Sequence, residues 1–115
     1  MSGNTKKFKM NVPYLERWTI LLIKEQYMVK SLIQDYARSN NGHLADKSFD
    51  ILCRYFALCG ELVLLVEMFL ESVSPTETIL ELHQLEYVTF KKIASSVASI
   101  RKELRTDYNI CLEIN

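Results

Sequence analysis

Residues 46–74 read DKSFDILCRYFALCGELVLLVEMFLESVS and are apolar around almost the whole circumference of a helix. On a 3.6-residue period, the polar side chains of this stretch collect into one narrow strip, formed by Lys47, Asp50, Arg54, Glu61, Glu67 and Glu71. A helix with so wide an apolar surface is normally packed on several sides. Its four charges between Ile51 and Val73 argue against a membrane span. We therefore predict a buried central helix around which the rest of the chain is arranged.

Gly60 stands in the middle of this helix, where glycine costs about 1 kcal/mol relative to alanine. We expect a compensating close approach of another backbone at this point. Asp46 is a suitable N-cap, and the Ser74-Pro75 pair predicts the end of the helix.

Two further helices are predicted on either side. The first begins at Pro13, which suits a first helical turn, and ends before Gly42. The other begins at Ser74, because Glu77 three residues later completes a capping box. Short connections make sequential helices antiparallel. The expected fold class is all-α, an elongated antiparallel three-helix bundle over residues 13–108 that dimerisation completes to a larger bundle.

The two ends of the chain differ from this helical domain. Residues 1–12 are polar, contain Lys6, Lys7 and Lys9 with no acid, and are interpreted as a flexible basic leader. Residues 109–115 form a short apolar tail in which apolar residues alternate with a period of two. Such a tail can fold back on the bundle or add a strand to another sheet, and a tail this short is more often simply packed or disordered.

Composition limits the class of protein. Apolar residues make up 49% of the chain, which argues against wholesale disorder, and the formal net charge is zero. A chain-wide basic field for nucleic acid is therefore not expected. Cys53, Cys59 and Cys111 are an odd number of cysteines, which favours a reducing, cytoplasmic compartment in which they act as small hydrophobic residues.

Residues that carry chemistry are few. His43 and His83 lie far apart, and neither has a cysteine or histidine at metal-ligand spacing. The chain has three glycines and no glycine-rich phosphate loop. We expect no metal and no cofactor, and the protein is interpreted as a non-enzyme.

One short motif keeps a catalytic alternative open. Residues 38–43 read RSNNGH, with Arg38 and His43 in an Arg-x4-His spacing at the end of a long helix. This spacing resembles the Arg-x4-to-6-His motif of HEPN ribonucleases. The resemblance implies a ribonuclease or toxin–antitoxin component that cleaves RNA across a dimer, in which Arg38 stabilises phosphate charge and His43 moves a proton. We favour the alternative interpretation, in which Asn-Gly forms a turn.

The apolar faces of the predicted helices exceed what three helices can hide from water. We therefore expect a protein-binding module, such as an adaptor, inhibitor or subunit, that forms a homodimer. The predicted interface consists of Tyr14, Ile20, Ile23, Tyr27, Ala94 and Ala98. The small side chains of this set allow a partner helix to approach closely. A nucleic-acid-associated regulator that uses the lysines of the leader is a further alternative, and its binding would depend steeply on salt.

Overall fold

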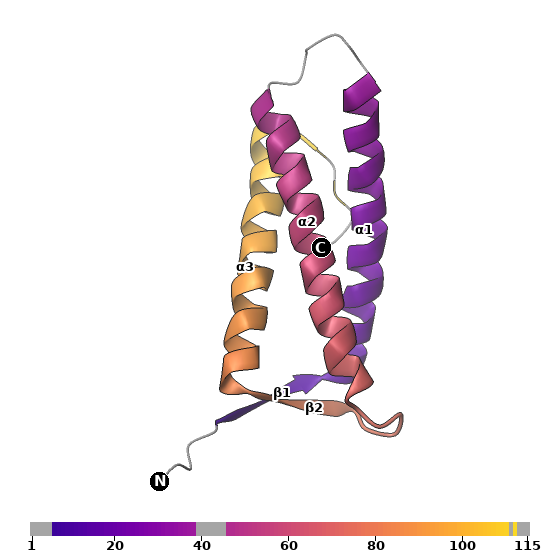
Figure 1. Cartoon of the computed structure of the whole chain (residues 1–115), viewed down its shortest axis with the longest axis vertical. Helices are drawn as coiled ribbons and strands as arrows, with labels where there is room; N and C mark the ends of the chain where they lie inside the picture. The colour runs from indigo at the N-terminus through magenta and orange to yellow at the C-terminus, as the bar shows by residue number, and fades with distance from the viewer. Residues whose placement is uncertain (1–5, 39–45, 111, 113–115) are drawn as a thin grey trace.

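The computed structural model describes residues 6–38, 46–110 and 112, with the backbone alone for residues 46–48. Over these residues the elements are, in order, β1 (Lys7–Asn11), α1 (Val12–Arg38), α2 (Asp46–Glu71), β2 (Ile79–His83) and α3 (Gln84–Asp107). Most of the described chain is helical, which confirms the helical fold class (Figure 1). The two-stranded sheet was not predicted: β1 lies in the segment interpreted as a leader, and β2 lies in the segment predicted to begin the third helix.

The centre of the fold is α2. It packs against both α1 and α3, whereas α1 and α3 make few contacts with each other (Figure 1). The molecule is accordingly a flat slab of 60 × 31 × 19 Å. The prediction that residues 46–74 organise the chain agrees with this packing, although α2 ends at Glu71 and not at Ser74.

Fully buried aliphatic and aromatic side chains line the inner surfaces of all three helices. They include Leu15, Leu22 and Val29 on α1, Leu52, Tyr55, Leu62 and Val66 on α2, and Val97 and Leu104 on α3. Burial of each such side chain stabilises the folded state by about 1.5–3 kcal/mol relative to leaving it in water. The core therefore follows α2 along its length.

Gly60 allows a close approach from α1, but the neighbour is a side chain and not the backbone that we expected. A Cβ atom on Gly60 would lie 2.8 Å from Gln26 Nε2. That nitrogen donates a 3.4 Å hydrogen bond to the carbonyl oxygen of Phe56. The missing Cβ thus leaves room for an amide that links α1 to the backbone of α2.

The segment that precedes α3 is a strand, and the predicted helix over residues 75–83 is wrong. Instead of capping a helix, Ser74 begins a turn in which Glu77 N donates to Ser74 O at 2.9 Å. From Ile79 to His83 exposed and buried residues then alternate, with Leu80 and Leu82 facing the core. This period of two is typical of a strand with one buried face.

The partner of β2 is β1, so the interpretation of residues 1–12 as a flexible leader is wrong for Lys7–Asn11. The strands are antiparallel, with Phe8 opposite Leu82 and Met10 opposite Leu80. Each partly buried β1 residue thereby meets a buried β2 residue, which the leader's own sequence could not reveal. The chain enters α1 through Asn11, whose side-chain oxygen accepts from Tyr14 N at 3.0 Å, as an N-cap does.

The chain turns back on itself after α3. Asn109 adopts a positive φ of 52°, and Ile110 N donates to Leu104 O at 3.0 Å. Ile110 and Leu112 are buried, and Arg105 Nη2 donates to Leu112 O at 3.0 Å. In Figure 1 the segment is drawn behind α2, between α3 and α1. For these two residues the fold-back interpretation of the tail is confirmed; the rest of 111–115 lies outside the described residues.

Candidate protein-binding groove between α1 and α3

Four aromatic rings connect the helices at the end of the slab that carries the sheet. Tyr14 stacks on Trp18 with ring centroids 6.2 Å apart, and Trp18 lies 6.0 Å from Phe90 of α3. Phe90 is buried and also lies 6.0 Å from Phe69 of α2. Large side chains thus span the distance between α1 and α3, which otherwise scarcely touch.

Beside these aromatic rings, a groove lies between the two outer helices, α1 and α3. Its volume is about 270 Å³. The residues that line this α1–α3 groove are Met10, Tyr14, Trp18, Phe90, Lys91, Ala94, Ser95 and Ala98. One wall is therefore aromatic and the other carries small side chains; no described residue of α2 lines the groove.

The small-residue wall results from the positions of alanine and serine along α3. Ala94 and Ala98 are one turn apart and lie on the same face, with Ser95 beside them. Helix axes approach to about 8–10 Å according to the side chains between them, and small residues permit the shorter distance. This wall can therefore receive a helix without rearrangement of large side chains.

Basic residues outnumber acidic residues around the groove, where the exposed acid Glu86 lies one turn from Phe90. Lys91 lines the groove, with its Nζ 5.7 Å from the centroid of the Tyr87 ring, which stacks on Phe8 of β1 at 4.1 Å. Arg17 lies one turn from Tyr14, and Lys102 one turn from Ala98, so both share a face with a groove residue. Lys91 is the one charged residue among the described lining residues. The groove is thus apolar inside and basic at its rim.

The structure brings together three of the six predicted interface residues. Tyr14, Ala94 and Ala98 line the groove. Ile23 lies nine residues after Tyr14, which at 3.6 residues per turn places it on the opposite side of α1. Ile20 and Tyr27 lie one turn from Ile23 and share its exposed face.

A second exposed apolar set lies on α2, and one of its two residues, Met68, was predicted to be core. Leu64 and Met68 are 65% and 63% exposed. They lie four residues apart on the strip that also contains Glu61 and Glu71. Periodicity alone placed Met68 in the core because α2 is rich in apolar residues all round. The packing of α2 shows instead that α1 and α3 cover two sides and leave the third open.

A polar cluster in the core bears on possible chemistry. Glu25 is fully buried on α1. The pKa of the Cys59 thiol is raised from 9.0 to about 12, mainly by burial and also by the Glu25 carboxylate, while the Arg101 guanidinium acts in the opposite direction. A thiol with this pKa is almost wholly protonated near neutral pH and therefore a poor nucleophile. Cys59 belongs to the packing of the core, as the sequence predicted.

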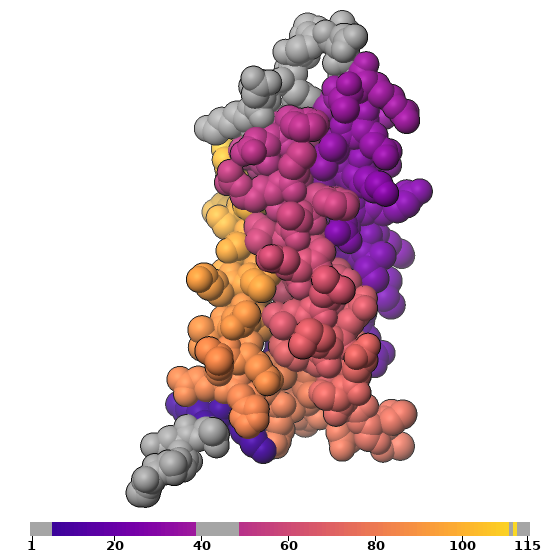
Figure 2. All heavy atoms as spheres, viewed as in Figure 1, coloured from indigo at the N-terminus to yellow at the C-terminus, as the bar shows by residue number. Residues whose placement is uncertain are grey.

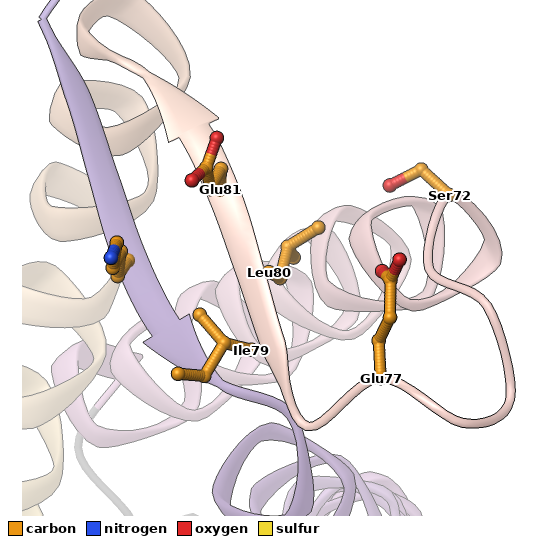
Figure 3. Close-up of a pocket in the computed structure, with 6 residues that line it drawn as sticks. Ser72, Glu77, Ile79, Leu80 and Glu81 are labelled. Carbon is orange, nitrogen blue, oxygen red and sulfur yellow. The ribbon is translucent and has the colours of Figure 1, made fainter.

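A larger hollow lies beside the sheet, between the end of α2 and β2 (Figure 3). Its volume is about 470 Å³, and its lining residues are Lys9, Ser72, Glu77, Ile79, Leu80 and Glu81. Figure 3 shows Glu77 on the turn and Glu81 on β2, with Ser72 beyond the helix end. Most of these side chains are exposed. The hollow is therefore open to solvent and lined by charged side chains of both signs, whereas the walls of the groove are mostly apolar.

The catalytic alternative involves Arg38 and His43. Arg38 is the exposed last residue of α1, and His43 lies outside the described residues. Across residues 6–38, 46–110 and 112, no group of three histidine, cysteine, aspartate or glutamate side chains could hold a metal ion. Over the same residues, no helix is both long and apolar enough to cross a bilayer.

Comparison of the chain with protein-family models, with curated proteins and with solved structures gave no match.

Proposed function

We propose that this protein is a small non-enzymatic binding module that receives a helix of another protein chain in the α1–α3 groove. The first partner that we propose is a second copy of the chain, in keeping with the homodimer expected from the sequence. The observation that carries the proposal is the groove's construction, an aromatic wall facing a small-residue wall under a basic rim.

Helix-in-groove recognition needs these features. An amphipathic helix presents apolar anchors at intervals of three and four residues, and the receiving surface must bury them. Tyrosine and tryptophan are enriched among the residues that carry binding energy in protein interfaces. Tyr14 and Trp18 supply such rings, and Tyr14 is 54% exposed although it lines an apolar surface. A partner chain would cover this ring.

The exposed apolar surface supports the same proposal. Soluble monomers rarely expose contiguous apolar patches larger than a few hundred Å². Here large apolar side chains are exposed on all three helices, including Tyr27 on α1, Leu64 on α2 and Leu85 on α3. Association would remove part of this surface from water.

Site-specific photocrosslinking tests the proposal. Tyr14 is replaced by benzoylphenylalanine, which keeps an aromatic ring in the groove. The matched control carries the same group at Ser31, an exposed position on α1 that does not line the groove. Irradiation in cells should give a protein adduct from position 14, either a second copy or another chain, and none from position 31. Equal labelling from both positions, or no adduct from either, would refute the proposal.

A further inference from the structure

The outer strip of α2 has the shape and charge that the groove requires. The strip, here called the α2 ridge, consists of Ala57, Glu61, Leu64, Met68 and Glu71. Its spacings alternate between four and three residues, so all five side chains lie on one face of the helix. All five are exposed. The ridge is thus an acidic amphipathic helix face with two large apolar side chains at its centre.

The ridge and the groove lie on opposite faces of the slab. The buried residues of α2 pack against α1 and α3, so its exposed strip points away from both. The groove is lined by α1, α3 and β1 and by no described residue of α2. Figure 2 shows α2 running along the middle of the viewed face, between α3 and α1. A single chain therefore cannot bring its own ridge to its own groove.

From this arrangement we infer that the α2 ridge of one copy docks in the α1–α3 groove of a second copy. This inference rests on the function proposed above and names both contacting surfaces. Leu64 and Met68 enter between the aromatic wall and the wall formed by Ala94 and Ala98. The small side chains of that wall leave the space that these two apolar side chains occupy.

Charge complementarity selects the ridge as the occupant. From Glu61 to Glu71 the α2 sequence contains three glutamates and no base. Around the groove, Lys91 lines the rim, and Arg17 and Lys102 lie one turn from groove residues. Opposite charges on two surfaces steer encounter and fix orientation. A groove-to-groove contact between two copies would instead place bases against bases.

The contact is heterologous, because it joins two different surfaces. A dimer of this kind leaves one groove and one ridge open, so further copies add unless the rotation between neighbours closes a ring. The smallest assembly is thus a dimer, and size should increase with protein concentration. Screening of the rim charges should weaken assembly as salt rises.

A mixing experiment tests the pairing. Ala98→Arg blocks the groove and leaves the ridge intact, whereas Leu64→Arg charges the ridge and leaves the groove intact. Both positions are exposed, so each variant should keep its helix content by circular dichroism. Thr89→Arg, at an exposed α3 position that neither lines the groove nor lies one turn from a lining residue, is the control. The readout is mass by sedimentation velocity.

The expected result is that wild type and Thr89→Arg associate, whereas Ala98→Arg alone and Leu64→Arg alone are monomeric. An equimolar mixture of Ala98→Arg and Leu64→Arg should form a 1:1 dimer and no larger assembly. Continued association of Leu64→Arg alone, with loss in Ala98→Arg, would overturn the ridge inference and leave the groove function standing. Association of Ala98→Arg alone would likewise overturn the ridge inference, because it would not need the groove. Monomeric wild type at high concentration would overturn the ridge inference, and the crosslink from position 14 would then decide the groove function separately.

Discussion

The contact between Gly60 and Gln26 gives a prediction whose size follows from the structure. Replacing a helical glycine by alanine stabilises a helix by about 1 kcal/mol. The new Cβ would lie 2.8 Å from Gln26 Nε2, so the amide has to move. Moving it breaks a hydrogen bond to Phe56 O that is 3.4 Å long. A hydrogen bond contributes about 0.5–1.5 kcal/mol, and one of this length belongs at the lower end.

The two effects nearly cancel, so Gly60→Ala alone should change the free energy of unfolding by less than about 0.5 kcal/mol. In a Gln26→Ala background the clash is absent, and Gly60→Ala should then stabilise by about 1 kcal/mol. Urea unfolding of the four chains, at one low protein concentration, measures this coupling as a double-mutant cycle. An equal effect of Gly60→Ala in both backgrounds, or destabilisation in the Gln26→Ala background, would refute the assignment of Gly60 to the Gln26 contact.

Three further predictions concern the core and the tail. Tyr55 is fully buried, and its hydroxyl has no hydrogen-bond partner among the described residues. Tyr55→Phe should therefore leave the free energy of unfolding unchanged or raise it by about 1 kcal/mol, and a loss of about 2 kcal/mol would show that the hydroxyl is paired. Because burial raises the pKa of Cys59 to about 12 from an ordinary value of 9.0, the native protein keeps its proton where the unfolded chain loses it. The Cys59 contribution to stability should be complete below pH 9 and decline toward pH 12. Between pH 9 and pH 12 the free energy of unfolding of Cys59→Ala should therefore fall less than that of the wild type, and equal pH profiles of the two proteins would contradict this. Leu112→Ala should destabilise by about 2–5 kcal/mol in thermal or urea unfolding, because Leu112 is buried, and an unchanged midpoint would show that the tail is not part of the core.

The long apolar periods were sufficient to predict the helices. Residues 46–74 could be assigned to a central helix because their apolar surface exceeds one stripe, and α2 does pack on two sides. Pro13 lies in the first turn of α1, as predicted. These signals are local, so they survive without knowledge of the rest of the fold.

The sheet could not be found in the same way. The two strands, Lys7–Asn11 and Ile79–His83, are five residues long, and each is stable only when paired with the other. In the sequence, α1 and α2 lie between them. At Ser74 the capping-box pattern competed with the alternation of Ile79–His83, and the pairing with β1 favoured the strand. Local propensity was overridden by a long-range contact.

The candidate site was predictable in its small-residue wall and not in its full extent. Ala94 and Ala98 were identified because they form a strip along one helix. Met10, which lines the groove, was assigned to the leader. Met68 was assigned to the core, because the exposure of Met68 depends on how α1 and α3 are placed around α2. The position of Ile23 on the opposite side of α1 from Tyr14 could have been derived from helical spacing alone, since a separation of nine residues corresponds to two and a half turns.

The fluorescence of Trp18 tests the groove most directly. Trp18 is the only tryptophan of the chain, is partly exposed and lines the groove, so its emission reports on this site alone. If the ridge of a second copy docks there, emission should shift to shorter wavelength as wild-type protein is concentrated, with the same midpoint as the change in mass. Leu64→Arg should show no shift at any concentration. Association of the wild type without any change in Trp18 emission would contradict occupation of the groove.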